Sequence, residues 1–571
     1  MINYRRGLLI ALVSAFILPT SIKAQTSNKD QIKIAPNNWH QLDRATTGYY
    51  GISLDKAYDL LKGKKSKTVI VAVIDSGIDT LQEDLKPILW TNPGEIPGNG
   101  IDDDKNGYVD DVHGWNFLGG KDGQNVNQDS YEAARVYWKL KSKYGAKDPD
   151  TSALAGTSKD EAVMFLKAKN KVVGDVNPAE VMMLRRIEPV LKKGDSIIQK
   201  DLGKTEFNGT DLLSYNPTSM EAKTAAAIYM NIAKLNKSND ITNKQILDDF
   251  EGQLRKADAA NTPPPNYRHD IVKDNYDDIN DRYYGNNDIM AGTPTHGTHC
   301  SGIIGAVRNN GLGMNGIADN VRIMMIRAVP DGDEHDKDIA NAIRYAVDNG
   351  AQVISMSFGK DFSPEKSWVD DAVRYAYSKD VLLVHAAGND HKNIDTADNF
   401  PNPIFIDKKG RAANFITVGA SGDATNGGFT ASFSNYGKKE VDVFAPGVNI
   451  YSTLPGGNKY GNLSGTSMAA PVVAGLAALI LEYYPNLTAE QIKYVIEKSV
   501  TPMKDPVELP GSKNEMDEDG NPTMVSLSDI SKTGGEINAY NAIKLAATVK
   551  GERKMDNEIL PKSKVIRKNR G

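Results

Sequence analysis

The chain has 571 residues, of which 40% are hydrophobic and 25% are charged, values that are ordinary for a soluble globular protein. This length suits one large domain with insertions, or roughly two or three domains. The formal net charge of −5 gives no reason to expect a nucleic-acid partner. A single cysteine, Cys300, excludes an internal disulfide framework and a thiolate zinc cluster.

The first residues have the features of an export signal. Arg5 and Arg6 precede an apolar run from Gly7 to Leu18, and Ile22-Lys23-Ala24 resembles a cleavage site. The apolar run is too short to span a bilayer comfortably, and no later run suggests a membrane helix. We therefore expect residues 1–24 to be removed and the mature chain to be a periplasmic or secreted monomer without an integral membrane segment.

A buried strand is predicted soon after the signal. Residues 25–65 form a short N-terminal extension in which residues 54–61 have a helical pattern. The apolar, largely β-branched run from Thr68 then ends in Asp75-Ser76-Gly77. Such a run is typical of a parallel strand covered on both faces. Because chemistry gathers at the carboxyl ends of such strands, Asp75 is a candidate functional residue, with a turn-forming aspartate as the alternative.

An acidic stretch, residues 99–111, is dense in oxygen ligands. Its spacing matches the opening of a calcium-binding loop, including Gly107 at the sixth position. The twelfth position is His113, where a regular EF-hand loop has glutamate. The stretch therefore has two interpretations, a structural calcium site and a solvated acidic turn. The candidate ligands are Asp102, Asp104, Asn106 and Asp110.

Residues 121–286, called the insert segment below, differ in composition from the rest of the chain. They contain few strand-like runs and many Lys, Glu, Asp and Ala residues. Apolar residues at helical spacing predict helices around residues 181–191, 225–235 and 246–254. The proline-rich residues 261–266 are typical of a linker. We predict a largely α-helical insertion whose function the sequence does not reveal.

Strands and helices alternate after the insert segment. His296 enters a helical stretch of small residues that continues to Gly305. Strands are then predicted at residues 321–329, 351–359, 381–389, 415–420 and 441–444, and helices at 338–347 and 366–377. This alternation predicts a parallel sheet with helices on both faces.

Ser467 follows Gly465-Thr466 and opens an apolar helical run that extends to Tyr483. A serine at a helix N-terminus lies beside unpaired backbone N–H groups and the positive end of the helix dipole. That position suits the stabilisation of negative charge on a substrate oxygen, although a simple N-cap is the commoner role. A further helix with a capping box is predicted at Thr488, and a closing helix at residues 534–547. Residues 549–571 form a basic tail.

Three side chains together match the needs of nucleophilic catalysis. A serine is a weak nucleophile until an imidazole takes its proton, and the imidazole needs a carboxylate to hold its orientation. Asp75, His296 and Ser467 supply this set in the chain order that subtilisin uses. Asn389, at the end of a predicted strand, can supply a side-chain amide to an oxyanion hole.

The chain resembles the subtilisin-like serine proteases over residues 66–120 and 287–548. The motifs that carry the resemblance are Asp75-Ser76-Gly77, His296-Gly297-Thr298-His299, Ala387-Gly388-Asn389 and Gly465-Thr466-Ser467-Met468-Ala469. The resemblance implies a subtilisin-like three-layer α/β fold with a mostly parallel central sheet, here interrupted by the insert segment. It also implies that Ser357, Phe358 and Gly359 pair with the substrate backbone and line one side of the pocket for the residue before the scissile bond.

The activity implied by the resemblance is peptide-bond hydrolysis through an acyl-enzyme. Ser467 would attack the scissile carbonyl, His296 would act as base and then acid, and Asp75 would orient His296. His299 would be a structural neighbour, and Cys300 would pack beside the histidine. No cofactor is needed for this chemistry, and proteins or peptides are the expected substrates. Two alternatives are a restricted processing protease gated by the insert segment and a pseudoprotease that binds peptides without turnover.

Overall fold

The computed structural model describes residues 35–553, except for positions 146, 175, 236–238, 240, 408, 424–427, 515 and 517–519. The predicted export signal, residues 1–24, and most of the basic tail lie outside the described residues.

A central sheet organises the described chain. Nine described strands form it, in the order β10-β13-β7-β6-β5-β4-β1-β3-β2, and all neighbours are parallel except β10 and β13. The strands are β1 (Val69–Asp75), β2 (Gly114–Asn116), β3 (Val321–Arg327), β4 (Val353–Met356), β5 (Leu382–Ala386), β6 (Phe415–Ser421), β7 (Val443–Pro446), β10 (Thr501–Pro502) and β13 (Gly535–Glu536). Two small antiparallel pairs lie outside it: β8 (Ile450–Leu454) with β9 (Lys459–Leu463), and β11 (Val507–Glu508) with β12 (Met524–Val525).

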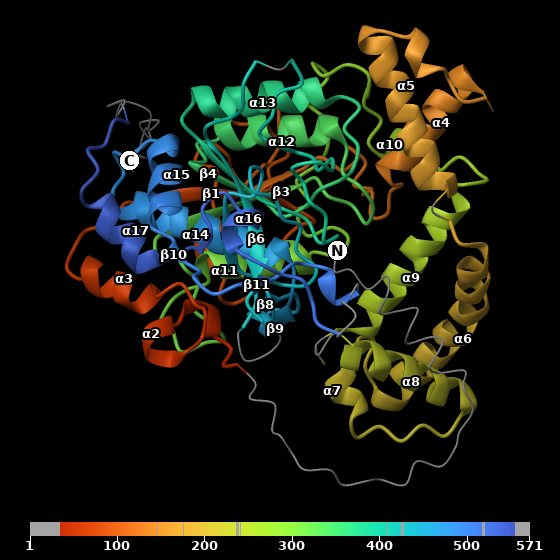
Figure 1. Ribbon diagram of the computed structural model, residues 1–571, viewed down its shortest axis with the longest axis horizontal. Coiled ribbons are helices and arrows are strands. Elements are labelled where there is room, and N and C mark those ends of the chain that lie inside the picture. Colours follow the sequence, from red (N-terminus) through yellow and green to blue (C-terminus); the bar gives the residue numbers. More distant parts are fainter. Residues whose placement is uncertain are drawn as a thin grey trace, which may run out of the picture.

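Helices cover both faces of the sheet. The described helices outside the insert segment are α2 (Arg44–Thr47), α3 (Leu54–Leu61), α11 (Thr295–Gly305), α12 (Asp336–Asp348), α13 (Lys366–Ser378), α14 (Thr466–Tyr483), α15 (Ala489–Lys498), α16 (Leu527–Ile530) and α17 (Ala539–Ala546). Figure 1 shows α12 and α13 above the sheet and α11 and α14 below it. Along β1, Val71 and Val73 pack in the core with α11 and α14, whereas Ala72 and Ile74 pack in the core with α12 and α13. This double burial explains why β1 is an unbroken apolar run.

Helix α14 lies at the centre of the lower core. It is the one described helix that is long and apolar enough to cross a membrane, but 94% of that stretch is buried inside the protein. Burial on all sides explains why its sequence lacks an amphipathic pattern. The helix is therefore a core element of the sheet body, the name used below for the described residues outside the insert segment, 35–120 and 287–553.

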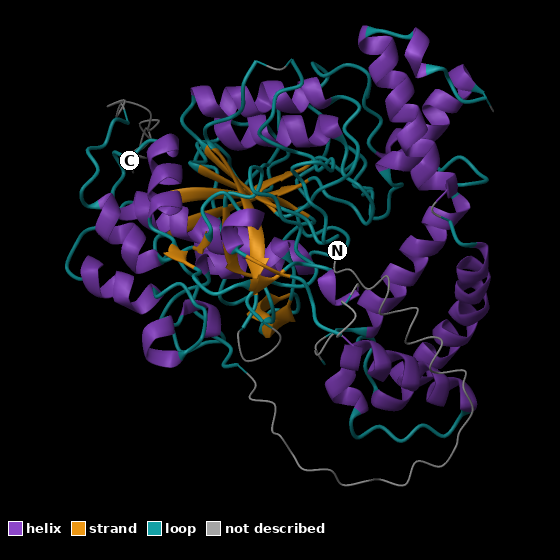
Figure 2. Cartoon of the chain, in the orientation of Figure 1, coloured by secondary structure: helices purple, strands orange, loops and turns teal. Residues whose placement is uncertain are grey.

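The insert segment is helical, as predicted. Its helices are α4 (Glu132–Tyr144), α5 (Gly156–Lys169), α6 (Pro178–Leu202), α7 (Gly209–Leu212), α8 (Met220–Leu235), α9 (Asn243–Asp258) and α10 (Tyr267–Ile271). One apolar core joins α6 to α9, and a second joins α4, α5 and Phe362 of the sheet body. Figures 1 and 2 show these helices in two groups beside the sheet, connected by the long α6 and α9.

The predicted fold class is confirmed: the structure is mixed α/β with a mostly parallel sheet. The prediction of one closing helix over residues 534–547 was wrong in its first part. Gly535 and Glu536 form β13, which pairs with β7, and the helix begins only at Ala539, after the capping residue Asn538. An available sheet edge thus outweighed local helical preference.

Candidate active site

Asp75 and His296 form the first contact of the site. Asp75 is the last residue of β1 and only 2% exposed, and its Oδ1 lies 2.8 Å from His296 Nδ1. The Ser76 backbone N–H also donates to this oxygen, at 2.7 Å. Gly297 allows the close approach of α11, because a Cβ there would lie 2.2 Å from the Gly77 carbonyl oxygen. The chain therefore fixes the imidazole against a buried carboxylate.

This contact changes the proton affinity of the histidine. Burial disfavours the imidazolium, but the Asp75 carboxylate outweighs that effect and raises the pKa of His296 above its usual value. A raised pKa means that the cation formed when His296 takes a proton is stabilised. Asp75 is therefore placed to stabilise the imidazolium form of His296.

Ser467 stands in the first turn of α14 and is 5% exposed. Its hydroxyl donates to the Ser357 carbonyl at 3.1 Å, and within the described residues no hydrogen bond joins it to His296. Cys300 contacts both residues: its Sγ lies 3.9 Å from His296 Nδ1 and 3.4 Å from the Ser467 backbone carbonyl oxygen. Without substrate, catalytic hydrogen bonds are often absent or long and form in the complex.

Asn389 follows β5, and Thr466 fixes its side chain. The amide oxygen of Asn389 accepts from the backbone N–H of Thr466 at 2.8 Å and from its hydroxyl at 2.9 Å. Because a backbone N–H can only donate, the amide is oriented with Oδ1 toward Thr466. A Cβ built on Gly465 would lie 3.5 Å from both Asn389 Nδ2 and Ser467 N. The missing side chain thus leaves space beside two N–H donors.

The segment Ser357-Phe358-Gly359 continues from β4 toward the serine. Ser357 contacts Ser467 twice, because its hydroxyl also donates to the Ser467 carbonyl at 2.9 Å. The Phe358 carbonyl lies 2.7 Å from His385 Nε2. Burial lowers the pKa of His385 to about 4, so this ring is neutral and its Nε2–H donates. The segment is thereby held at the site.

The two other candidates near the histidine are buried. His299 Nε2 lies 3.1 Å from the Gly461 carbonyl, and burial lowers the pKa of His299 to about 3. Burial also raises the pKa of the Cys300 thiol, which therefore stays protonated. Both have the surroundings of structural groups.

The acidic loop does not bring all four predicted calcium ligands together. Asp110 has a φ of 53° and its carboxylate accepts from the backbone N–H groups of Gly98 and Gly100 at 2.7 and 2.8 Å. Asp102 and Asp104 both accept from the N–H of Asn106.

A different carboxylate group converges at this loop. Oxygen atoms of Glu95, Asp104 and Asp111 lie within 4.8 Å of one another, which is a spacing that suits a cation. Burial raises the pKa of Asp111 to about 6 despite three hydrogen bonds to its carboxylate. Of the predicted ligands, Asp104 belongs to this group and Asn106 contacts it, with Nδ2 3.0 Å from Asp111 Oδ2 and 3.3 Å from Asp104 Oδ2, so the predicted residues fit a calcium ion in part.

The parallel sheet carries Asp75, Ser357 and Asn389 at the carboxyl ends of β1, β4 and β5, with His296 and Ser467 at the starts of two helices. The candidate residues thus gather at one edge of the sheet, where the carboxyl ends of its parallel strands meet. A model of the family described as "Subtilase family" matches residues 66–525, so the chain belongs to the subtilase family.

Curated relatives agree with the family. The chain is 42% identical over 205 residues to a thermophilic serine proteinase of Bacillus sp. strain AK1, which covers 36% of this chain and 46% of that protein. It is 38% identical over 235 residues to thermitase of Thermoactinomyces vulgaris, covering 40% of this chain and 77% of thermitase. The match thus spans less than half of the first relative.

Among solved structures, the chain is similar to a protease from Pseudoalteromonas arctica PAMC 21717. The TM-score is 0.44 and the sequence identity 20%, with 89% of this chain and 97% of that chain covered.

The sequence did not single out several residues that hold the site. Thr466 orients the Asn389 amide. Its position between Gly465 and Ser467 in the sequence could have indicated a role at the site. Glu132 and Lys360, which pair beside the Ser357–Gly359 segment at 2.7 Å, carried no signal, because 228 residues separate them in the chain.

Proposed function

We propose that this protein is an exported serine endopeptidase that uses Asp75, His296 and Ser467 as its catalytic triad. The hydrogen bond between Asp75 and His296, beside a serine at the start of α14, carries the proposal. Ser467 attacks the scissile carbonyl, His296 takes its proton and later gives it to the leaving amine, and Asp75 holds the ring. An acyl-enzyme forms, and water then releases it.

The oxyanion of this reaction would be stabilised by Asn389 Nδ2 and the Ser467 backbone N–H. Both donors border the space left open at Gly465. Ser357, Phe358 and Gly359 would pair with the substrate backbone before the scissile bond. Removing the Asn389 amide should cost roughly 2.7–4 kcal/mol of transition-state stabilisation. The Glu95–Asp104–Asp111 group would hold any structural calcium, which the chemistry itself does not need.

The sequence of residues 1–24 supports export. The proposed substrates are proteins or peptides, and the proposed active form is a monomer. A protease of restricted specificity is the second candidate. Contacts of the insert segment with the substrate-binding segment favour it, because Glu132 pairs with Lys360, the residue that follows Gly359.

Labelling with a fluorophosphonate probe tests the activity. Wild-type protein should label at Ser467, and Ser467→Ala should abolish both label and peptide hydrolysis. His296→Ala should abolish them too, whereas His299→Gln, a change outside the triad, should leave labelling measurable in any protein that folds. Absence of label on folded wild-type protein would instead favour a peptide-binding pseudoprotease.

A further inference from the structure

Two segments leave the sheet on either side of Asp75. In the sheet order, β1 lies between β3 and β4. After β3, the backbone N–H groups of Ala328 and Val329 donate to the Asp75 carbonyl, and after β4 the Ser357 carbonyl contacts Ser467. A peptide that pairs with Ser357–Gly359 would therefore run between residues 328–335 and residues 357–360, a space called the gap below. This step rests on the proposed function.

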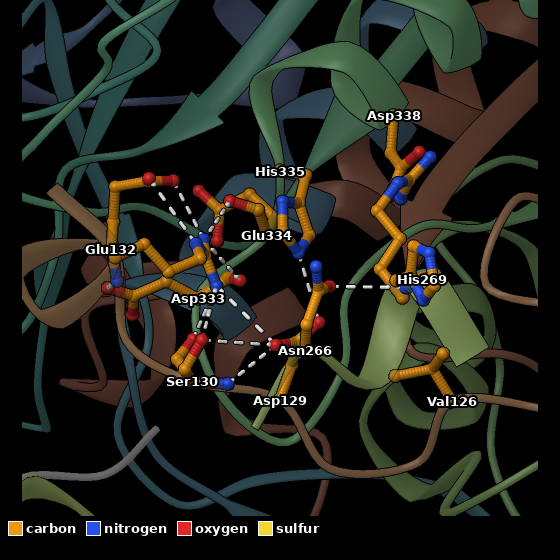
Figure 3. Close-up of polar contacts among 12 residues, drawn as sticks. Val126, Asp129, Ser130, Glu132, Asn266, His269, Asp333, Glu334, His335 and Asp338 are labelled. Carbon is orange, nitrogen blue, oxygen red and sulfur yellow. Dashed lines mark hydrogen bonds and ion pairs between the residues drawn. The ribbon is translucent and has the colours of Figure 1, made fainter. Parts of the chain in front are cut away.

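The insert segment occupies the outer edge of the first of these segments. Gln128 forms a parallel bridge with Asp331, in which Asp331 accepts from Asp129 N–H and donates to the Asn127 carbonyl, both at 2.9 Å. Figure 3 shows Asp129, Ser130 and Glu132 beside Asp333 and Glu334. Since successive residues of an extended chain turn their polar groups to opposite edges, the gap lies on the other side of this segment.

Lys360 crosses the gap. Its ammonium group donates to the Glu334 carbonyl at 2.8 Å and pairs with Glu132 Oε2 at 2.7 Å and Asp336 Oδ1 at 2.9 Å. The side chains of Lys360 and Glu132 are only 2% and 3% exposed. A buried lysine with three acceptors is held firmly, because moving any one partner would leave a charge unpaired.

Where Lys360 contacts Glu334, the backbone carbonyl groups already accept hydrogen bonds, and the adjoining cavity is small. Arg135 of α4 also donates to the Glu334 carbonyl, at 3.2 Å, and to the Asp333 carbonyl, at 3.0 Å. The cavity lined by Glu334, Lys360 and Phe400 has a volume of about 10 Å³, which holds one water molecule and no side chain. The carbonyls of Asp333 and Glu334 are therefore already hydrogen-bonded to Arg135 and Lys360 and are not free to pair with a substrate residue.

We propose that the Glu132–Lys360–Glu334 bridge closes the acyl-side end of the substrate groove. Ser357 lies nearest the nucleophile, so residues 358 and 359 bind substrate residues progressively farther from the scissile bond. Lys360 comes next and is fixed across the gap. Each strand position pairs with one substrate residue, so the protease recognises about three residues before the scissile bond. In longer substrates, the residues beyond the third leave the groove at the bridge. Glu132, from the insert segment, is a specificity-determining residue of this site.

Peptide nitroanilides that share the residue before the bond, with one, two, three or five acyl-side residues, test this on wild-type enzyme. We expect kcat/KM to rise up to three residues and to change by less than about twofold from three to five. A gain of about tenfold or more from three to five residues would overturn the proposed closure. Fluorophosphonate titration of Ser467 sets the concentration of active enzyme, so loss of label would contradict the proposed function instead.

The double variant Glu132→Ala, Lys360→Gly removes the two side chains that pair across the end of the groove, while Asp336 keeps its hydrogen bonds from the Ser363 hydroxyl and the Glu365 N–H. Its five-residue substrate should gain at least about fivefold over its three-residue substrate. Lys366→Met is the matched control, because Lys366 borders the same cavity but pairs at 2.5 Å with Asp370 of its own helix. Lys366→Met should behave like the wild type, with nearly the same kcat/KM for the three-residue and five-residue substrates. A double variant that labels normally and keeps the plateau would also contradict the proposal. If it does not fold, the wild-type series still decides.

Discussion

The sheet body and the insert segment are stabilised in different ways. In the sheet body, β1 is buried on both faces and α14 on all sides, so one continuous arrangement of strands positions Asp75 and Ser467. The insert segment has a small apolar core of its own in α6 to α9, shares others with the sheet body, and contacts the Ser357–Lys360 segment through the buried charge of Glu132. The difference suggests a division of labour in which the sheet body sets the chemistry and the insert segment sets how much substrate is recognised.

Two buried aspartates make this comparison testable. Asp75 is 2% exposed and contacts His296, whereas Asp195 of α6 is 3% exposed and accepts from Tyr229 at 2.8 Å and Asn243 at 2.9 Å. Asp75→Asn should lower kcat by about 10⁴-fold, because an amide cannot hold the imidazole in the required tautomer or stabilise its cation. Burst-normalised hydrolysis of a short peptide ester measures the change.

The control is Asp195→Asn, the same substitution in the insert segment. It should cost about 1–3 kcal/mol of stability in the helical region, since a buried hydrogen-bond network loses an acceptor, and should leave kcat within about twofold. Hydrogen exchange of α6 and α8 reports the first effect. A loss of kcat similar to that of Asp75→Asn would break the division between the two regions.

The second prediction compares the apolar cores. Phe415 of β6 and Phe250 of α9 are both fully buried. Truncation of either to alanine should cost about 3–5 kcal/mol. Only Phe415→Ala should reduce fluorophosphonate labelling in proportion to unfolding, because β6 belongs to the sheet body, while Phe250→Ala should unfold α6 to α9 and leave Ser467 reactive. Proteolysis mapping and labelling on the same samples separate the two results. Concerted loss of both regions in both variants would show that they fold as one unit.

The sequence predicted the sheet body well, since its signals are local. The apolar run that ends at Asp75 became β1, and the motifs around His296, Asn389 and Ser467 each occupy a strand end or a helix start. A short motif suffices there, because the parallel sheet brings the carboxyl ends of its strands to one edge.

Long-range and backbone-dependent features could not be predicted in this way. The positive φ of Asp110 turns its carboxylate to the N–H groups of Gly98 and Gly100, away from the Glu95–Asp104–Asp111 group, and the spacing of the loop did not reveal this division. The contact of Glu132 with Lys360 depends on how α4 lies against the sheet body. Neither residue belongs to a pattern, because a buried ion pair leaves no periodic trace in the sequence.

The smallest expected effect concerns the exposed contacts of the same interface. Lys167 of α5 pairs with Asp398 of the sheet body at 2.6 Å, but the side chains are 56% and 46% exposed. Solvent screens such a pair, and two long side chains lose freedom to form it, so Lys167→Met should change stability by less than about 1 kcal/mol. The kcat/KM of this variant should still change by less than about twofold between the three-residue and five-residue substrates. Thermal unfolding at low and high salt, together with the nitroanilide series, checks both expectations. If Lys167→Met released the plateau as the Glu132→Ala, Lys360→Gly variant is expected to, the exposed contacts would hold the groove end, and the buried bridge would lose its special role.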